Sequence, residues 1–402
     1  MFDLAVIGTG IMGAPTAWHA QRSGASVVAI GVLEPAEPDQ HTGLFGAWHD
    51  SSRLLWRHHA DPADTELTRR SIEAIRAIET ECGNTLLTEV GFLFTADRGL
   101  DEGILSDSED IESLLLLDHT DLADRFAYLA LSPGVVGYVE GAPSGYISPR
   151  GVVNAFVSSA AASGADVVQD QVTAVDVHAD RVEVVISSGR RIAARKAVLA
   201  TGAFSNTTQF LPRPVALRRK SETALMVELN LAKNPELIDM PTFVYELDSD
   251  LVSDIYMVPP MMYPNGKMMM KFGANTPHDR YLNDEEIQHW YREGDSAAVT
   301  PTMQKAFSRL FPSVDVDDWH AVRCVIARTP HGRPFIDTLV DGRLYCAIGG
   351  NGHSAKWAGA IGELAASLAL TESWSDTVIP ATHHRVQYAD AAHTWKSRDL
   401  FM

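Results

Sequence analysis

The sequence predicts an α/β fold in which a doubly wound parallel sheet is interrupted by an inserted α+β domain with a mixed sheet. The first thirty residues read as strand, glycine turn, helix and strand, which is how such a sheet begins. Similar elements return only near the middle and the end of the 402-residue chain. Because chains longer than roughly 250–300 residues divide into domains, the intervening segments are expected to fold together as a second domain.

The glycine turn near the start is typical of a Rossmann-type dinucleotide-binding domain. The apolar segment Phe2–Ile7 runs directly into the turn, and a helical pattern follows as far as Gly24. In such turns the first glycine permits a tight bend, the second lets the backbone approach a pyrophosphate, and the third lets helix and strand pack closely. The cofactor-binding candidates in the turn are Gly8, Gly10, Ile11, Met12 and Gly13.

Further cofactor contacts are expected from the ends of other strands. An acidic residue should follow the second strand, Ser26–Ile30, to bind a ribose hydroxyl, but Gly31 stands there and Glu34 is the candidate instead. The strand Ala197–Thr201 ends in a second glycine turn. The candidates from these strands are Glu34, Ala200, Thr201, Gly202 and Val172, the last at the start of the strand Val172–Val177.

The distribution of these elements sets the predicted domain boundaries. Nucleotide-type elements are also expected as a helix at Val152–Ser163, a strand at Arg343–Ile348 and a helix at Gly359–Leu370. The segments between them have mixed signals, including a strand at Lys267–Gly273. The predicted cofactor domain comprises residues 1–90, 146–215 and 321–402, and the predicted substrate domain comprises residues 91–145 and 216–320.

Composition and charge limit the classes of function. With 52 acidic residues against 33 basic ones, the net charge is −19, which repels nucleic-acid backbones and anionic membranes. No apolar run approaches the roughly 20 residues that span a bilayer, and no metal site is predicted. The three cysteines, Cys82, Cys324 and Cys346, are too few for a disulfide framework and favour a reducing compartment, here the cytoplasm.

The stretch from Arg323 to Leu370 carries the most specific pattern. Cys324 is expected to start a strand and is followed five residues on by Thr329 and then by Ile336-Asp337, and the loop Gly349–Lys356 comes next. Together with the two glycine turns and the segment Trp48–Arg53, these residues resemble the monomeric sarcosine oxidase and N-methyltryptophan oxidase family of D-amino-acid-oxidase-like flavoproteins. The resemblance spans most of the chain, although the two substrate-domain segments match poorly apart from the region around Lys271.

The resemblance implies an FAD cofactor and residues that hold it. Cys324 matches a cysteine that carries the flavin covalently, whereas a lone cysteine without such a pattern is usually a small core residue. The further cofactor contacts that the resemblance implies are Ser52, Arg53, Gly349, Gly350, Asn351, Gly352, His353 and Lys356.

The resemblance also implies catalytic residues. Lys271 matches a lysine that activates dioxygen, since a buried cation stabilises the charge that oxygen acquires on reduction. Lys356 matches a lysine that pairs with the substrate carboxylate, and Arg53 or Arg57 supplies a guanidinium partner. The choice between the arginines stays open, because the segment before the second one is a residue longer than in the family. Tyr256 matches a tyrosine that touches the same carboxylate, and His353 matches a position close to the flavin.

The predicted activity is that of an FAD-dependent oxidase acting on a secondary or N-substituted amino acid. A hydride would leave the carbon beside the nitrogen, giving an imine, and dioxygen would be reduced to hydrogen peroxide. Two alternatives stay open, namely a dehydrogenase with another electron acceptor and a non-catalytic dinucleotide-binding protein. The expected partners are a small amine and dioxygen, with no nucleic acid and no membrane, and the expected state is a monomer or a small homo-oligomer.

Overall fold

The first sheet is built on the parallel strands that the opening of the chain predicts. The computed structural model describes residues 1–35, 43–44, 46–101, 114–207, 210–294 and 296–395. The parallel strands are, in spatial order, β9 (Asp166–Val168), β2 (Val27–Ile30), β1 (Phe2–Ile7), β12 (Arg191–Leu199) and β19 (Leu344–Ile348). Antiparallel strands extend it, namely β18 (Phe335–Val340) beside β19, and the hairpin β10 (Val172–Val177) and β11 (Val182–Ile186) beside the first half of β12.

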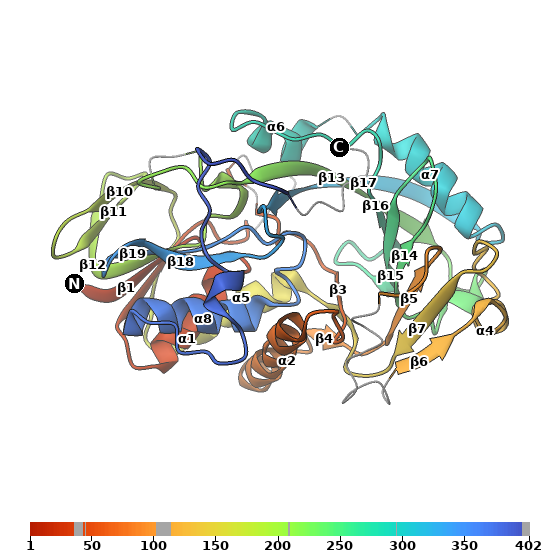
Figure 1. Ribbon diagram of the computed structural model, residues 1–402, viewed down its shortest axis with the longest axis horizontal. Helices are drawn as coiled ribbons and strands as arrows, with labels where there is room; N and C mark the ends of the chain where they lie inside the picture. Colours follow the sequence, from red (N-terminus) through yellow and green to blue (C-terminus); the bar gives the residue numbers. More distant parts are fainter. Residues whose placement is uncertain (36–42, 45, 102–113, 208–209, 295, 396–402) are drawn as a thin grey trace.

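Helices cover one face of this sheet. They are α1 (Gly13–Arg22), α5 (Pro149–Ala162) and α8 (Ala358–Thr371), and α2 (Pro62–Cys82) packs against the last two. Figure 1 shows α1 and α8 side by side beneath the strands. Their close approach depends on Gly362 of α8, where a Cβ would lie 2.6 Å from the Cβ of Pro15 in α1.

The second sheet is mixed and joins segments that are far apart in the sequence. Its strands are, in spatial order, β17 (Val316–Arg328), β13 (Arg218–Leu229), β16 (Met268–Ala274), β15 (Asp254–Met262), β14 (Thr242–Glu246), β5 (Phe92–Ala96), β7 (Val136–Glu140) and β6 (Leu114–Leu117). Helix α7 (Val299–Leu310) lies along its outer side, away from the first sheet (Figure 1). Two shorter helices, α4 (His119–Arg125) and α6 (Glu286–Glu293), flank it.

Alternation along the strands of the second sheet separates a core face from a cavity face. On β16, Met270 and Phe272 belong to the apolar core under α7, and the ring of Phe272 contacts that of Phe307 at 5.4 Å. Met269 and Lys271, which point the other way, line a cavity. The period of two in a strand therefore puts the charged residue on the inner face of the sheet.

A small third sheet connects the two large ones. It consists of β3 (Arg53–Leu55), β8 (Gly145–Ile147) and β4 (Leu87–Thr88). Short 3₁₀ turns complete the described secondary structure at η3 (Gly202–Phe204), η4 (Pro235–Leu237) and η5 (Ala381–His383). Among the described residues, no helix has the length and apolar character that crossing a membrane requires.

The predicted α/β class with a Rossmann-type beginning is confirmed, and two strand starts are corrected. Strand β12 begins at Arg191 rather than Ala197, because its first residues, Arg191–Ala194, pair with the hairpin strand β11. Strand β17 begins at Val316 rather than Cys324 and runs through the predicted boundary at 320/321. The division into two domains stays a prediction, and residues 102–113 of the predicted substrate domain lie outside the described residues.

Candidate active site

A cavity of about 1770 Å³ lies where the carboxyl ends of β1 and β12 meet the inner face of the second sheet. This volume exceeds the roughly 300–1,000 Å³ typical of a site for one small ligand, so a dinucleotide and a substrate fit together. The predicted residues that line it are Gly8, Gly10, Ile11, Met12, Glu34, Arg53, Val172, Ala200, Thr201, Gly202, Tyr256, Lys271, Cys324, Gly350, Asn351, Gly352, His353 and Lys356. The predicted residues that lie outside the lining are Gly13, Ser52, Arg57 and Gly349.

The glycine turn has the close packing that dinucleotide binding requires. Gly8 has a φ of 100°, and a Cβ there would lie 2.4 Å from the carbonyl oxygen of Ala200. A Cβ on Gly13 would lie 1.7 Å from the carbonyl oxygen of Gly8. The turn therefore sits against the second glycine turn and presents the N-terminus of α1 to the cavity, where it can bind phosphate. These residues fit the phosphates of FAD.

The absence of an acid at position 31 has a steric cause. A Cβ on Gly31 would lie 2.6 Å from Thr9 Oγ1 and 2.7 Å from the Thr9 amide nitrogen, so a side chain has no room there. Glu34 reaches the cavity instead. Its carboxylate pairs with the Arg150 guanidinium and accepts a 3.1 Å hydrogen bond from Asn154 Nδ2. Glu34 is thus held in place at the cavity wall, and its binding of a ribose hydroxyl stays a prediction.

The residues between Cys324 and Lys356 are joined by one buried amide. Asn351 Oδ1 accepts from the Thr329 amide at 2.8 Å, and Asn351 Nδ2 donates to the Gly349 carbonyl at 2.6 Å. A Cβ on Gly349 would lie 2.3 Å from Thr329 Cγ2, which explains glycine at this position. These contacts hold the end of β17 against the loop that leads into α8. The spacing between Cys324, Thr329 and Asn351 therefore fixes the position of Cys324 relative to Lys356.

Cys324 is the cysteine that lines the cavity. Its sulfur lies 3.9 Å from Arg53 Nη2, and its carbonyl accepts a 2.9 Å hydrogen bond from Trp290 Nε1. Cys346 is buried in the first sheet, where burial raises its thiol pKa to about 12, and Cys82 ends α2. The position of Cys324 suits covalent attachment of a cofactor.

Two cations and one carboxylate meet at the inner face of the second sheet. Lys271 is only 2% exposed, and its Nζ contacts Asp50 Oδ2 and lies 3.3 Å from the Ser52 carbonyl oxygen. The Arg53 guanidinium pairs with the same Asp50. Burial and the neighbouring Arg53 hold the Lys271 pKa well below its ordinary value, whereas contact with Asp50 favours the charged form. The family-like segment that begins at Trp48 thus also supplies the counter-ion of Lys271, which sequence reasoning missed.

The second predicted lysine lies on an aromatic face. Lys356 is buried, and its Nζ lies 3.0 Å from the centroid of the Trp56 ring, where the ring's negative face attracts a cation. Trp56 stacks on Phe92 of β5 with ring centroids 5.0 Å apart, and the His353 ring meets its edge at 6.0 Å. Strand β5 therefore positions Lys356 through two stacked rings.

Arg53, rather than Arg57, belongs to the cavity wall. The backbone amide of Arg57 donates to Glu140 Oε2 at 2.8 Å, and the next amide, that of His58, donates to Glu140 Oε1 at 3.0 Å. Glu140 is fully buried and also accepts from Ser144 Oγ at 2.6 Å. The buried carboxylate thus fixes the loop after β3 and leaves Arg53, at the start of that strand, to face the cavity.

Tyr256 belongs to a buried polar network that the sequence did not indicate. Its hydroxyl donates to Glu222 Oε1 at 2.9 Å, and both residues line the cavity. Burial, together with the Glu222 charge, raises the pKa of Tyr256 well above its ordinary value. Glu222 Oε2 accepts from Lys220 Nζ at 2.6 Å, and the same Nζ lies 2.7 Å from Asp279 Oδ2. The pair of charges two residues apart on one face of β13 is the signal that could have found this network.

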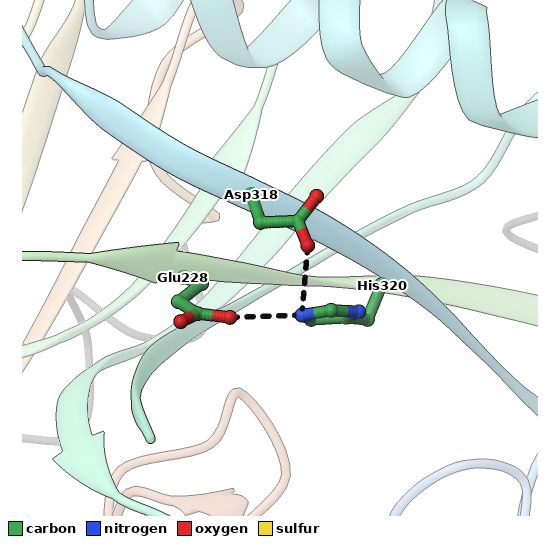
Figure 2. A group of neighbouring side chains, drawn as sticks. All are labelled: Glu228, Asp318 and His320. Carbon is green, nitrogen blue, oxygen red and sulfur yellow. Dashed lines mark hydrogen bonds and ion pairs between the residues drawn. The ribbon is translucent and has the colours of Figure 1, made fainter.

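One group among the described residues has the ligands that a metal ion could use. Figure 2 shows the His320 imidazole facing Glu228 and Asp318. Its Nε2 lies 3.0 Å from Glu228 Oε2 and 3.6 Å from Asp318 Oδ2. Lys267 Nζ also contacts Glu228, at 2.6 Å. Hydrogen bonds from His320 and Lys267 lower the pKa of Glu228. The group lies outside the cavity lining, and the Lys267 ammonium group already supplies a positive charge beside Glu228.

The chain belongs to the family of FAD-dependent oxidoreductases, because the family model described as "FAD dependent oxidoreductase" matches residues 3–368. It is 25% identical over 385 residues to the monomeric sarcosine oxidase of Streptomyces avermitilis, covering 92% of this chain and 94% of that protein. The predicted resemblance, the FAD cofactor and the classification as an enzyme are thereby confirmed.

Solved structures agree in fold. The chain is similar to NikD, described as an unusual amino acid oxidase essential for nikkomycin biosynthesis, with a TM-score of 0.79 and 20% identity over 98% of this chain and 99% of that one. It is also similar to L-proline dehydrogenase from P. horikoshii, with a TM-score of 0.71 and 17% identity over 95% of this chain and 96% of that one. At these identities the likeness shows the fold alone.

Proposed function

We propose that the protein is an oxidase that removes a hydride from the carbon beside the nitrogen of a secondary or N-substituted amino acid, giving an imine and hydrogen peroxide. The observation that carries the proposal is the gathering of Lys271, Lys356, Arg53 and Tyr256 around the cavity that also contains the glycine turn. A bound FAD would accept the hydride and pass the electrons on. The sparse cysteines support a cytoplasmic location.

Lys356 and Arg53 are proposed to bind the substrate carboxylate. A guanidinium offers two parallel donors that match a carboxylate, and Arg53 lines the cavity. Lys356 rests on the Trp56 ring, which holds the ammonium group without cancelling its charge. Fixing the carboxylate in this way orients the neighbouring C–H bond, and such positioning supplies a large share of catalysis.

Cys324 is proposed to hold FAD covalently. The sulfur is half-buried in the cavity wall beside Arg53, and the spacing to Thr329 matches the family pattern. Acid precipitation tests the attachment. Yellow colour should stay in the pellet of the wild-type protein and leave with the supernatant of Cys324→Ser.

The function is tested by mixing the purified protein anaerobically with sarcosine, L-proline, fructosyl-glycine and octopine, which represent four classes of carboxylate-bearing secondary amine. At least one amine should bleach the flavin absorbance, and air should restore it with one hydrogen peroxide formed per turnover. If none of the four bleaches the flavin, the proposal is wrong.

A dehydrogenase with a quinone or protein acceptor is the second candidate, and one contact favours it. The Asp50 carboxylate touches Lys271 Nζ, so part of the positive charge offered to dioxygen is already neutralised. Comparing the peroxide yield with the rate of dye reduction separates the two. Fast dye reduction with slow peroxide formation would select the dehydrogenase.

A further inference from the structure

We propose that Tyr256 and Glu222 form a relay that takes the ammonium proton from the bound substrate, an inference that rests on the function proposed above. The Tyr256 hydroxyl donates to Glu222 Oε1 at 2.9 Å. A phenol has one proton to donate, so the Tyr256 oxygen offers only lone pairs to the cavity. It therefore suits the nitrogen end of the substrate as an acceptor, not the carboxylate to which the resemblance assigns it.

The reaction needs such an acceptor. An aliphatic amine is a cation at pH 7, since its pKa is near that of lysine at roughly 10, and a nitrogen without a free electron pair cannot support the departure of a hydride from its neighbour. In the relay, a nitrogen–hydrogen bond breaks and an O–H bond forms at Tyr256 Oη, while the proton already on Oη passes to Glu222 Oε1. Tyr256 ends as it began, Glu222 becomes a neutral acid, and the amine gains its lone pair.

The surroundings of Glu222 tolerate both of its charge states. Burial disfavours the charged form of Lys220, but Glu222 and Asp279 hold the pKa of Lys220 above its ordinary value. When Glu222 becomes neutral, Asp279 Oδ2 still lies 2.7 Å from Lys220 Nζ. The buried cation therefore keeps a partner, and taking up a proton does not leave it uncompensated, which would be costly inside a protein.

Charged and titratable groups face the relay from each strand around it. They are Lys220 beside Glu222 on β13, Asp279 after β16, Asp254 on β15, Lys271 on β16, Cys324 on β17 and Arg53 on β3. Asp254 is the competing proton acceptor, because it also lines the cavity. Its carboxylate accepts hydrogen bonds from Asn275 and Ser253, and burial raises its pKa.

The experiment measures the limiting rate of anaerobic flavin reduction from pH 6 to pH 10 with whichever of the four amines bleaches the wild-type holoenzyme. In Tyr256→Phe and in Glu222→Gln, the rate at pH 7 should fall by about 100-fold, the scale of general base catalysis. It should recover toward the wild-type value near pH 10, because the amine then binds already neutral. Substrate affinity should change less than the rate, since the carboxylate contacts are intact.

Tyr245→Phe is the matched control. Its hydroxyl also donates to a carboxylate, Asp97 Oδ1 at 2.7 Å, but it lies outside the cavity lining, so its pH profile should equal that of the wild type. Profiles of Tyr256→Phe and Glu222→Gln with an unshifted midpoint would overturn the relay, as would a shift caused by Asp254→Asn and not by Glu222→Gln. Absence of bleaching in the wild type overturns the proposed function itself, so the two failures are distinct.

Discussion

Lys271 is a buried lysine whose effect on the reaction with dioxygen can be isolated by substitution. In Lys271→Met, oxidation of the reduced protein by dioxygen should slow by about 100-fold or more, because a preorganised charge inside a protein has an effect of this size. Anaerobic reduction by the amine should change only a few-fold. Stopped-flow absorbance after mixing the reduced protein with oxygenated buffer gives the rate.

Lys267→Met is the matched control, since this lysine lies four residues upstream, pairs with Glu228 and is outside the cavity lining. It should leave the reaction with oxygen unchanged. Equal oxygen rates in Lys271→Met and the wild type would contradict the role of Lys271.

Gly273 provides the space that the Tyr256 ring occupies. A Cβ at this position would lie 1.9 Å from Tyr256 Cζ, so Gly273→Ala should push the ring away from Glu222. Displacements of about 1 Å cost on the order of 100-fold in rate, and flavin reduction should slow accordingly while FAD content stays the same. Gly141→Ala, where a Cβ meets nothing within 4 Å, is the control. An unaffected rate in Gly273→Ala would refute the steric argument.

At the scale of residues, the sequence predicts those side chains whose spacing is itself the signal. Cys324, Asn351 and Lys356 lie within one continuous motif, and the structure brings them to one cavity. Asp50 and Glu222 were not predicted as site residues, because their partners are distant along the chain. The separation is 221 residues for the Asp50–Lys271 contact and 34 for the Glu222–Tyr256 hydrogen bond. Spacing carries no information about such contacts.

At the scale of elements, the crossing of α1 and α8 makes a specific prediction. Gly362→Ala would place a Cβ 2.6 Å from the backbone and Cβ of Pro15, and overpacking of this kind costs about 1–3 kcal/mol. Chemical denaturation should report a loss of that size in the free energy of unfolding. Glu363→Ala, on the exposed side of the same helix, should change it far less. Equal stability of the two variants would show that the helices adjust freely.

The elements that the sequence located best are those whose own residues carry the whole strand or helix pattern. Strand β1 is found at the predicted Phe2–Ile7, and β16 and α8 are each within one residue of their predicted bounds. The starts of β12 and β17 were wrong because the first residues of each strand lack a clear strand pattern and are held in the sheet by pairing with a neighbouring strand. Strand pairing is a tertiary property, so local composition cannot define such starts.

At the scale of the whole molecule, a buried histidine links stability to pH. His384 is fully buried, its Nδ1 donates to the Pro334 carbonyl at 2.9 Å, and burial lowers its pKa from 6.5 to about 4. Between these values the unfolded chain binds a proton that the folded chain does not, so stability falls as pH decreases from about 6.5 to about 4. At about 1.4 kcal/mol per pKa unit, this effect is at most about 3 kcal/mol.

Denaturation at pH 7 and pH 5 measures this dependence. His384→Gln should reduce the difference between the two pH values, although the variant is less stable at both. The exposed His289 provides the control, and His289→Gln should retain the wild-type difference. If His384→Gln also retained it, the pH dependence would have another origin.

The architecture of the whole molecule was predictable because nucleotide-type elements recur in three separate parts of the sequence. The inner wall of the second sheet was not predictable, since it combines strands from residue 92 to residue 328 and pairs some that are far apart in the chain, such as β13 with β17 and β14 with β5. The family resemblance is also poorest there, which is why the sequence leaves the amine unnamed.

The long antiparallel pair formed by β13 and β17 limits how far the cavity walls can move. The pair extends from the contact of Arg218 with Arg328 to that of Leu229 with Val316, and Thr329, directly after β17, is bonded to the loop that leads into α8. Closing the cavity by a hinge would require bending this continuous ladder. We therefore expect the cavity walls to be in position before a ligand binds, which would lower the ordering cost of association.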